Sequence, residues 1–132
     1  MKRIYDLIII GAGPAGITAA VYAARKKIDI LVVTKDIGGQ AARSGDIQNY
    51  TGYQFISGPE LAEKFEEHMR KFNFNIKENE EVTKLVAKQN NFLVKTDKNS
   101  YWAKTVIVAS GKKSRELGVS GEKEFKNKGL VY

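Results

Sequence analysis

Gly11, Gly13 and Gly16 are spaced as G-x-G-x-x-G and follow directly on the apolar run Ile8–Ile10. Gly11 allows a tight turn out of a strand, Gly13 lets the backbone approach a phosphate closely, and Gly16 lets the next helix pack against the strand. Pro14 suits the first position of that helix, where its missing N–H costs nothing. The free N–H groups and the positive dipole end of such a helix favour an anion. The pattern therefore predicts a site for the pyrophosphate of a nucleotide cofactor.

The segments on either side of this turn support that interpretation. Ile8–Ile10 is an unbroken β-branched run, which is typical of a strand buried on both faces of a parallel sheet. A second strand is expected over Ile30–Val33. NAD-binding units usually carry an acidic residue at the end of that strand, to hold the adenosine ribose. Here Thr34 and Lys35 come first and Asp36 lies two residues late, so the sequence departs from an ordinary NAD dehydrogenase.

Composition limits the other classes of function. The chain has 132 residues, a net charge of +7 and no cysteine, so it forms one modest domain without disulfides, thiolate metal sites or a cysteine nucleophile. Its lysines are interleaved with acidic residues, and we expect no nucleic-acid partner. No apolar run could span a bilayer and no signal peptide is evident, so we expect a cytoplasmic protein without a membrane partner. His68, the one histidine, cannot build a catalytic triad or a metal site by itself, and we predict no catalytic or metal-binding residue.

A polar loop is expected from Asp36 to Gly58, and long loops in compact domains are usually functional. The paired glycines Gly38 and Gly39 again permit close approach of the backbone. Gln40 and Asn49 offer both donors and acceptors, so they could bind the edge of a heterocycle. They could equally serve as amides that cap the loop.

The rest of the chain predicts one helix and several strands. The helix covers Pro59–Phe72, with Ser57 as its N-cap, and an apolar stripe at helical spacing faces the core. The stripe consists of Leu61, Phe65, Met69 and Phe72. Expected strands lie at Phe74–Ile76, Glu81–Lys88, Phe92–Thr96, Tyr101–Lys104 and Thr105–Ala109, the last short and buried. The predicted fold is a doubly wound, Rossmann-like parallel α/β sheet with an inserted antiparallel β-meander.

Four motifs occur in the order GAGPAG, GGQ, DIQNY and IVASG. Together they resemble the thioredoxin reductase family, which includes the flavoprotein subunit of alkyl hydroperoxide reductase. The resemblance covers essentially the whole chain and implies FAD as the cofactor. It implies four groups of cofactor-binding residues. In order, they lie at the pyrophosphate, at the adenosine with its adenine, at the flavin side, and at the turn that closes the last strand. These are Gly11, Gly13, Pro14, Ala15 and Gly16; Thr34, Lys35, Asp36 and Val82; Gly38, Gly39, Gln40 and Asn49; and Ala109, Ser110 and Gly111, where Ser110 replaces a threonine of the family.

Members of this family pass electrons from NADPH through FAD to a Cys-x-x-Cys pair, and then to thioredoxin or a similar dithiol protein. The family's Cys-x-x-Cys follows the stretch that resembles Gly129–Tyr132. We therefore expect residues 1–111 to be the N-terminal part of an FAD-binding domain, and residues 112–132 to be an extended linker towards an NADPH-binding domain. Alone, the chain should be inactive and should expose apolar surface or a strand edge. The full-length enzyme should be a homodimer.

Two alternatives stay open. The chain could be the FAD-binding part of a dithiol-free flavoprotein that resembles ferredoxin–NADP reductases. It could also be a free-standing module that binds a dinucleotide without catalysis. The residues after Tyr132 would distinguish the first alternative, because only the thioredoxin reductase type should continue into Cys-x-x-Cys.

Overall fold

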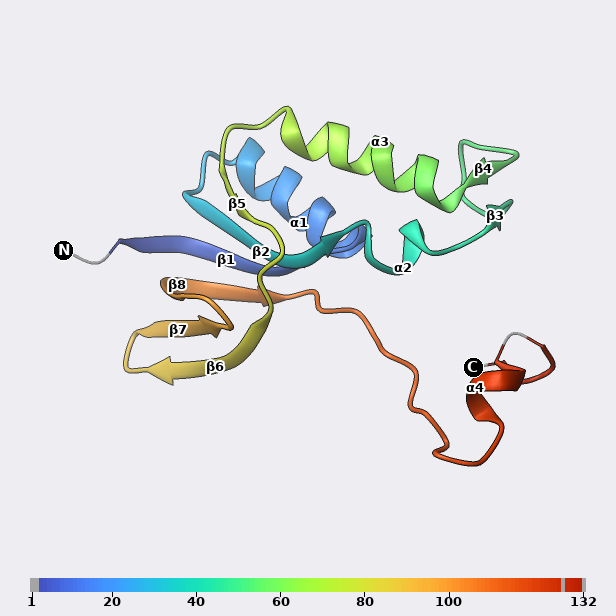
Figure 1. Ribbon diagram of the computed structural model, residues 1–132. Coiled ribbons are helices and arrows are strands. Elements are labelled where there is room, and N and C mark those ends of the chain that lie inside the picture. The colour runs from blue at the N-terminus through green and yellow to red at the C-terminus, as the bar shows by residue number, and fades with distance from the viewer. Residues whose placement is uncertain (1–2, 127, 132) are drawn as a thin grey trace.

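Figure 1 shows the computed structural model, which describes residues 3–126 and 128–131. In chain order, the elements are β1 (Ile4–Ala12), α1 (Pro14–Arg25), β2 (Ile30–Ile37), α2 (Gly39–Ala42), β3 (Asp46–Ile47), β4 (Ile56–Ser57), α3 (Gly58–Arg70), β5 (Asn75–Lys77), β6 (Val82–Lys88), β7 (Asn91–Thr96), β8 (Ser100–Val108) and α4 (Glu122–Phe125).

One mixed sheet carries the fold, with strand order β5-β2-β1-β8-β7-β6. Strands β5, β2, β1 and β8 are parallel, whereas β6 and β7 pair antiparallel and join the sheet through β8. Helices α1 and α3 lie together on one side of the parallel strands, and the β6–β7 hairpin lies on the other (Figure 1). The predicted Rossmann-like α/β sheet with an antiparallel meander is confirmed.

Strand β1 is buried on both faces, as its apolar run predicts. Leu7 and Ile9 pack in the cluster that α1 and α3 cover, together with Met69 of α3. Ile8 and Ile10 point the other way and pack against residues of the meander, such as Val94. Alternate side chains of an extended strand face opposite sides, so both cores depend on the register of this one strand.

Strand β8 is one continuous strand where the sequence predicts two, divided after Lys104. The sequence predicts two strands, Tyr101–Lys104 and Thr105–Ala109, yet they form one continuous element, and no turn residue separates them. Its first residues, Ser100–Ala103, pair with β7, and the whole strand from Trp102 onward runs beside β1.

The second half of β8 is not buried, contrary to the sequence-based prediction. In the described chain it pairs with β1 alone, and Ile107 and Val108 are 40% and 61% exposed. The expected strand edge and apolar surface are therefore both present. Lys104 Nζ contacts Asp6 Oδ1 at 2.6 Å, and Thr105 Oγ1 donates to the Asp6 carbonyl at 2.7 Å, which joins the two strands further.

The expected loop from Asp36 to Gly58 is more structured than predicted. Strand β2 continues to Ile37, and α2, β3 and β4 follow within the segment. Gly58 donates its N–H to the Gly45 carbonyl at 2.9 Å, and a Cβ on Gly58 would lie 2.3 Å from the carbonyl oxygens of Ala41 and Ser44. These contacts join residues more than ten positions apart, so the local sequence does not reveal them.

Helix α3 agrees closely with its prediction. The Ser57 hydroxyl accepts from the Glu60 N–H at 3.3 Å and caps the helix. Leu61 and Met69 are buried, Phe65 and Phe72 pack partly buried against the same core, and His68 is exposed. Strand β5 begins one residue later than expected, at Asn75.

Glu80 is a buried carboxylate that the sequence pattern does not identify; it is 3% exposed. Its oxygens accept from the Tyr101 hydroxyl at 3.0 and 3.1 Å, from the Asn99 side chain at 3.2 Å and from the Thr96 hydroxyl. The carboxylate thus ties the start of β6 to the turn between β7 and β8. Burial, followed by the hydrogen bond to Glu80, raises the pKa of Tyr101 to about 12.

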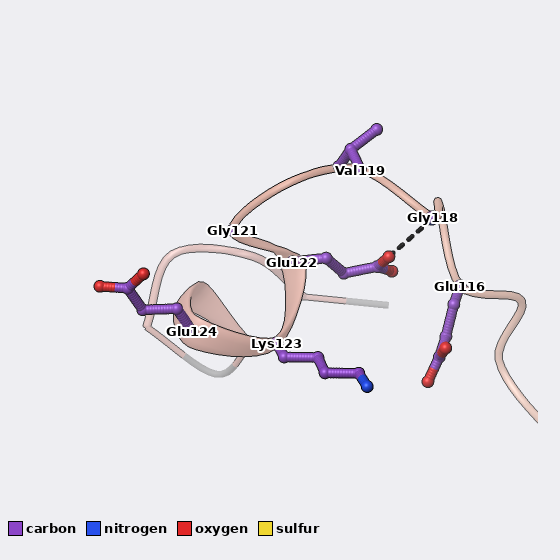
Figure 2. Close-up of a pocket in the computed structure, with 7 residues that line it drawn as sticks. All are labelled: Glu116, Gly118, Val119, Gly121, Glu122, Lys123 and Glu124. Carbon is purple, nitrogen blue, oxygen red and sulfur yellow. Dashed lines mark hydrogen bonds between the residues drawn. The ribbon is translucent and has the colours of Figure 1, made fainter.

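The segment after Gly111 leaves the sheet in an extended course and ends in the short helix α4 (Figure 1). The buried Glu122 carboxylate accepts from the N–H groups of Leu117 and Gly118 at 2.7 and 2.6 Å; Figure 2 shows the second of these bonds. The expected extended course is present, with one helical turn that the sequence does not predict, and the role of this segment as a linker stays a prediction. Asn127 and Tyr132 lie outside the described residues.

Gly16→Ala should destabilise the chain by about 3 kcal/mol, because overpacking forces backbone elements apart. A Cβ on Gly16 would lie 1.9 Å from the Gly11 carbonyl oxygen. Gly45→Ala is the matched control, since no atom lies within 4 Å of its Cβ position. Urea unfolding followed by circular dichroism measures both variants. Equal stability of the two would contradict the close packing of α1 on β1.

Stability should fall at high pH because of Tyr101. The folded chain raises the pKa of this phenol from 10.0 to about 12, so its contribution is full below pH 10 and is lost as the pH rises to 12. Absorbance titration at the phenolate band should show one late-ionising tyrosine. Tyr101→Phe should remove that component, and Glu80→Gln should move it to lower pH. A late component that persists in Tyr101→Phe would show that the assignment is wrong.

Candidate cofactor-binding site

The glycine turn lies where β1 ends and α1 begins, and its packing leaves no room for side chains at two positions. Gly11 has φ +100°, and a Cβ there would lie 2.4 Å from the Ala109 carbonyl oxygen. A Cβ on Gly16 would strike the Gly11 carbonyl oxygen. The predicted roles of Gly11 in the tight turn and of Gly16 in close helix–strand packing are both confirmed.

Gly13 differs from these two glycines because its missing side chain faces open space. No atom lies within 4 Å of its Cβ position. It caps α1, with Pro14 at the first helical position, and the first helical hydrogen bond runs from the Ile17 N–H to the Gly13 carbonyl at 2.9 Å. The amides of Ala15 and Gly16 precede that bond, so a ligand can accept from them. The first turn holds no acidic residue, which leaves the positive helix end free to attract an anion.

The second glycine pair lies directly beside this turn. Gly38 donates its N–H to the Ala12 carbonyl at 2.8 Å, and Gly38 has φ +86°. A Cβ on Gly39 would lie 3.3 Å from the Gly13 Cα, so the two loops touch through glycine alone. Gln40 joins this loop to the segment after β8, since its Nε2 donates to the Lys112 carbonyl at 3.1 Å.

The end of β8 closes the other side. The Ala109 N–H donates to the Ile10 carbonyl at 2.8 Å, and the Ala109 Cβ lies 3.5 Å from the Cβ position of Gly16. Ser110 and Gly111 follow as exposed residues outside any helix or strand, and Gly111 has φ +67°. We call the three segments together, residues 11–16, 38–40 and 109–111, the glycine site. Carboxyl ends of neighbouring parallel strands are the usual ligand-binding edge of such sheets.

Thr34 is placed as a structural residue at the end of the buried part of β2. It is 4% exposed, and its hydroxyl accepts from the Ala12 N–H at 3.1 Å and donates to the Asp36 carbonyl. The hydroxyl therefore holds the glycine turn against β2, a role that spacing in the sequence does not indicate. Arg43 is also not identified from the sequence; it pairs with the Asp36 carboxylate at 2.7 Å.

Val82 and Asn49, the two other predicted cofactor-binding residues, lie at different distances from the carboxyl edge of the sheet. The Glu80 N–H donates to the Thr34 carbonyl at 3.1 Å, and Lys35 pairs with Glu81 at 3.2 Å. The half-buried Val82 follows immediately, so it lies next to the end of β2. Asn49, in contrast, lies on the exposed loop between β3 and β4, and no hydrogen bond within the described chain joins it to the glycine site.

The donor set of the glycine site fits a diphosphate, because it offers helix amides and glycine surfaces without an opposing carboxylate. A hollow elsewhere in the chain does not fit such a ligand. It is lined by Glu116, Glu122 and Glu124 against the single cation Lys123 (Figure 2). Across the described residues, no cluster of three or more histidine, cysteine or acidic side chains could hold a metal ion. None of the helices described is long and apolar enough to cross a membrane.

Comparison with known proteins agrees with this arrangement. The family model for pyridine nucleotide-disulphide oxidoreductases matches residues 5–132. Thioredoxin reductase of Bacillus subtilis is 41% identical over 99% of this chain and 42% of its own length. The structure of Lactococcus lactis thioredoxin reductase matches with a TM-score of 0.86 and 35% identity, over 92% of this chain and 40% of that one. The structure of Streptococcus pyogenes thioredoxin reductase matches with a TM-score of 0.83 and 45% identity, over 95% of this chain and 41% of that one.

The chain thus spans about two-fifths of the length of the relatives that it matches. The family match covers all the segments that build the glycine site. The chain therefore belongs to the pyridine nucleotide-disulphide oxidoreductase family, and within it resembles the thioredoxin reductases.

Proposed function

We propose that this chain is the FAD-binding portion of a thioredoxin-reductase-like flavoprotein. One observation carries the proposal: the open Cβ position of Gly13 at the N-terminus of α1, with Gly39 packed beside it. A backbone surface without side chains, next to free helix amides, suits the two phosphates of a dinucleotide.

The neighbouring segments support a direction for the bound cofactor. The pyrophosphate lies over residues 13–16, and the adenosine extends towards the end of β2, near Lys35, Asp36 and Val82. The flavin side extends towards Gly38, Gly39 and Gln40 and the turn at 109–111. Thr34 contributes by fixing the glycine turn rather than by offering its hydroxyl, which is already bonded within the chain. Asn49 reaches the cofactor only if its exposed loop folds towards the glycine site.

FAD, when bound, supplies the hydride chemistry, and the chain supplies binding and orientation. The α1 amides hold the negative phosphates, and the glycines exclude side chains from the contact. In the whole protein, electrons pass from NADPH through FAD to a dithiol and on to thioredoxin or a similar disulfide. These 132 residues contain no cysteine, so the dithiol belongs to sequence outside them.

The division into an FAD-binding part (1–111) and a linker (112–132) belongs to the same proposal. It is supported by the course of the chain, which leaves the sheet after the end of β8 at Val108 and does not return to it (Figure 1). Homodimerisation, a cytoplasmic location and the inactivity of these residues by themselves stay predictions.

Titration with FAD, followed by flavin fluorescence and visible absorbance, tests the proposal. The wild-type chain should bind FAD one to one. Gly13→Ala should weaken binding about tenfold or more, because a methyl group there pushes a phosphate off the helix amides. Its thermal stability should match that of the wild type, since the added methyl meets no protein atom.

Gly45→Ala is the control substitution, because it adds the same methyl group in open space away from the turn. Riboflavin is the control ligand, because it lacks the pyrophosphate, so Gly13→Ala should not alter its binding. Unchanged FAD affinity in Gly13→Ala, or no saturable binding by the wild type, would contradict the proposal that these residues hold the cofactor.

A further inference from the structure

Four apolar side chains form one row across the outer face of the meander. Val86 of β6 pairs with Leu93 of β7, and Leu93 pairs with Trp102 of β8. Trp102 is in turn the register partner of Ile4 in β1. Register partners share a face of a sheet, so the four side chains lie side by side across four strands. We call them the apolar row.

The apolar row lies outside both cores. Neither core cluster of the described residues includes any of its members. Val94 and Tyr101 follow and precede Leu93 and Trp102 in sequence and pack in the second core, so the row is on the opposite face. Ile4 is 45% exposed, and the other three are half-buried. Helices α1 and α3 lie over the parallel strands, away from β6 and β7 (Figure 1), so they leave this part of the row uncovered.

Lysines flank the apolar row on both sides. Lys84 and Lys95 lie two residues from it along β6 and β7, and Lys88 lies two residues from it on the other side. A step of two residues keeps a side chain on the same face and moves it about 7 Å along the strand. All three lysines are exposed, and none forms an ion pair with a carboxylate in the part of the chain that the structure describes. The outer face is therefore apolar along its middle and positive along both margins.

Lys84 and Lys95 are also direct register partners. Like charges at opposed positions of an antiparallel pair destabilise that pair. A lysine on an edge strand protects the edge from aggregation, but that role needs a lysine on β6 alone and does not account for Lys95 on β7. A carboxylate of a binding partner, placed beside both ammonium groups, would offset their repulsion.

The dimensions of the outer face suit one helix. Four strands about 4.8 Å apart make the apolar row about 14 Å long, roughly the rise of ten helical residues. The lysines lie about 7 Å to either side, within reach of side chains on the flanks of a helix about 10–12 Å wide. The row is recessed between longer lysine side chains, whereas a surface that enters a membrane projects its apolar groups about 5–10 Å into the lipid. A helix therefore fits this face better than a bilayer does.

We propose that the outer face of the meander binds an acidic amphipathic helix of a partner protein. The apolar stripe of that helix covers the apolar row, and its carboxylates meet Lys84 and Lys95 on one side and Lys88 on the other. This surface is separate from the glycine site. Ile4 begins β1 and Gly11 lies near its end, about 20 Å away along an extended strand.

A synthetic peptide tests the proposal. It has about 14 residues, with leucines at helical spacing and glutamates on both flanks of the leucine stripe. Trp102 is the sole tryptophan of the chain, so its burial under the peptide should shift the emission to shorter wavelength in a saturable way. A second peptide with lysine in place of each glutamate should bind about tenfold more weakly or less. Equal binding of the two peptides, or no saturable response to the acidic one, would overturn the proposal.

Substitutions locate the contact. Lys84→Gln and Lys95→Gln should each weaken peptide binding about threefold. Neither should lower the midpoint of thermal unfolding, because each removes a repulsion between like charges. Lys77→Gln is the matched control, an exposed strand lysine that pairs with Val33 of the second core and so lies away from the apolar row. An equal loss of binding in Lys77→Gln would show a general charge effect and would overturn the surface.

Other occupants of the outer face give different results. A larger Trp102 response to vesicles that contain phosphatidylglycerol, or to a single-stranded oligonucleotide, than to the acidic peptide would overturn the helix as the ligand. A shift of the emission to longer wavelength on dilution of the chain alone would mean that a second copy covers the apolar row, and would overturn the proposal too. So would peptide binding by this chain but not by a longer protein that contains it, because other residues of that protein would then cover the row.

Discussion

The contact between Gly16 and the Gly11 carbonyl is the constraint on which the site depends. The backbone of α1 rests on the end of β1 at a distance that only glycine permits. That approach aims the first amides of the helix at the carboxyl edge of the sheet. It also brings the turn against Ala109, which directly follows the last residue of β8. The second glycine pair adapts to the same surface, because Gly39 approaches the Gly13 Cα with no side chain between them. The positions of the helix, the strands and the loops at this edge therefore depend on one another.

Strand β8 connects the two halves of the molecule. Its first residues pair with the meander and its later residues run beside β1. The same strand thus carries Tyr101, which is bonded to the buried Glu80, and leads into Ala109 at the glycine site. Glu80 has a similar linking role, since its backbone N–H bonds to Thr34 while its carboxylate holds Tyr101. Buried polar groups that are fully bonded in this way specify one arrangement of neighbouring elements.

The sequence predicts the elements whose signals are local. The β-branched run of β1, the glycine turn and the capped, periodic helix α3 are all of this kind. The errors arise where pairing joins distant residues. The predicted break between Lys104 and Thr105 is wrong, because no turn residue lies there and β8 is continuous. The sequence of the short β3–β4 pair looks like that of a loop, because strands of two residues have no periodicity. The roles of Thr34 and Glu80 depend on partners far along the chain, which spacing alone does not identify.

The pairing of β1 with β8 also determines the order in which this protein can fold. The hydrogen bond from Thr105 to the Asp6 carbonyl spans 99 residues of chain. Closing so long a segment costs conformational entropy before any contact repays it, and such pairings form slowly. During synthesis, β1, α1 and β2 can associate early, because they are adjacent in sequence. One edge of β1 stays unpaired until the ribosome has released residues beyond Val108, so the glycine turn makes its contact with Ala109 only at the end.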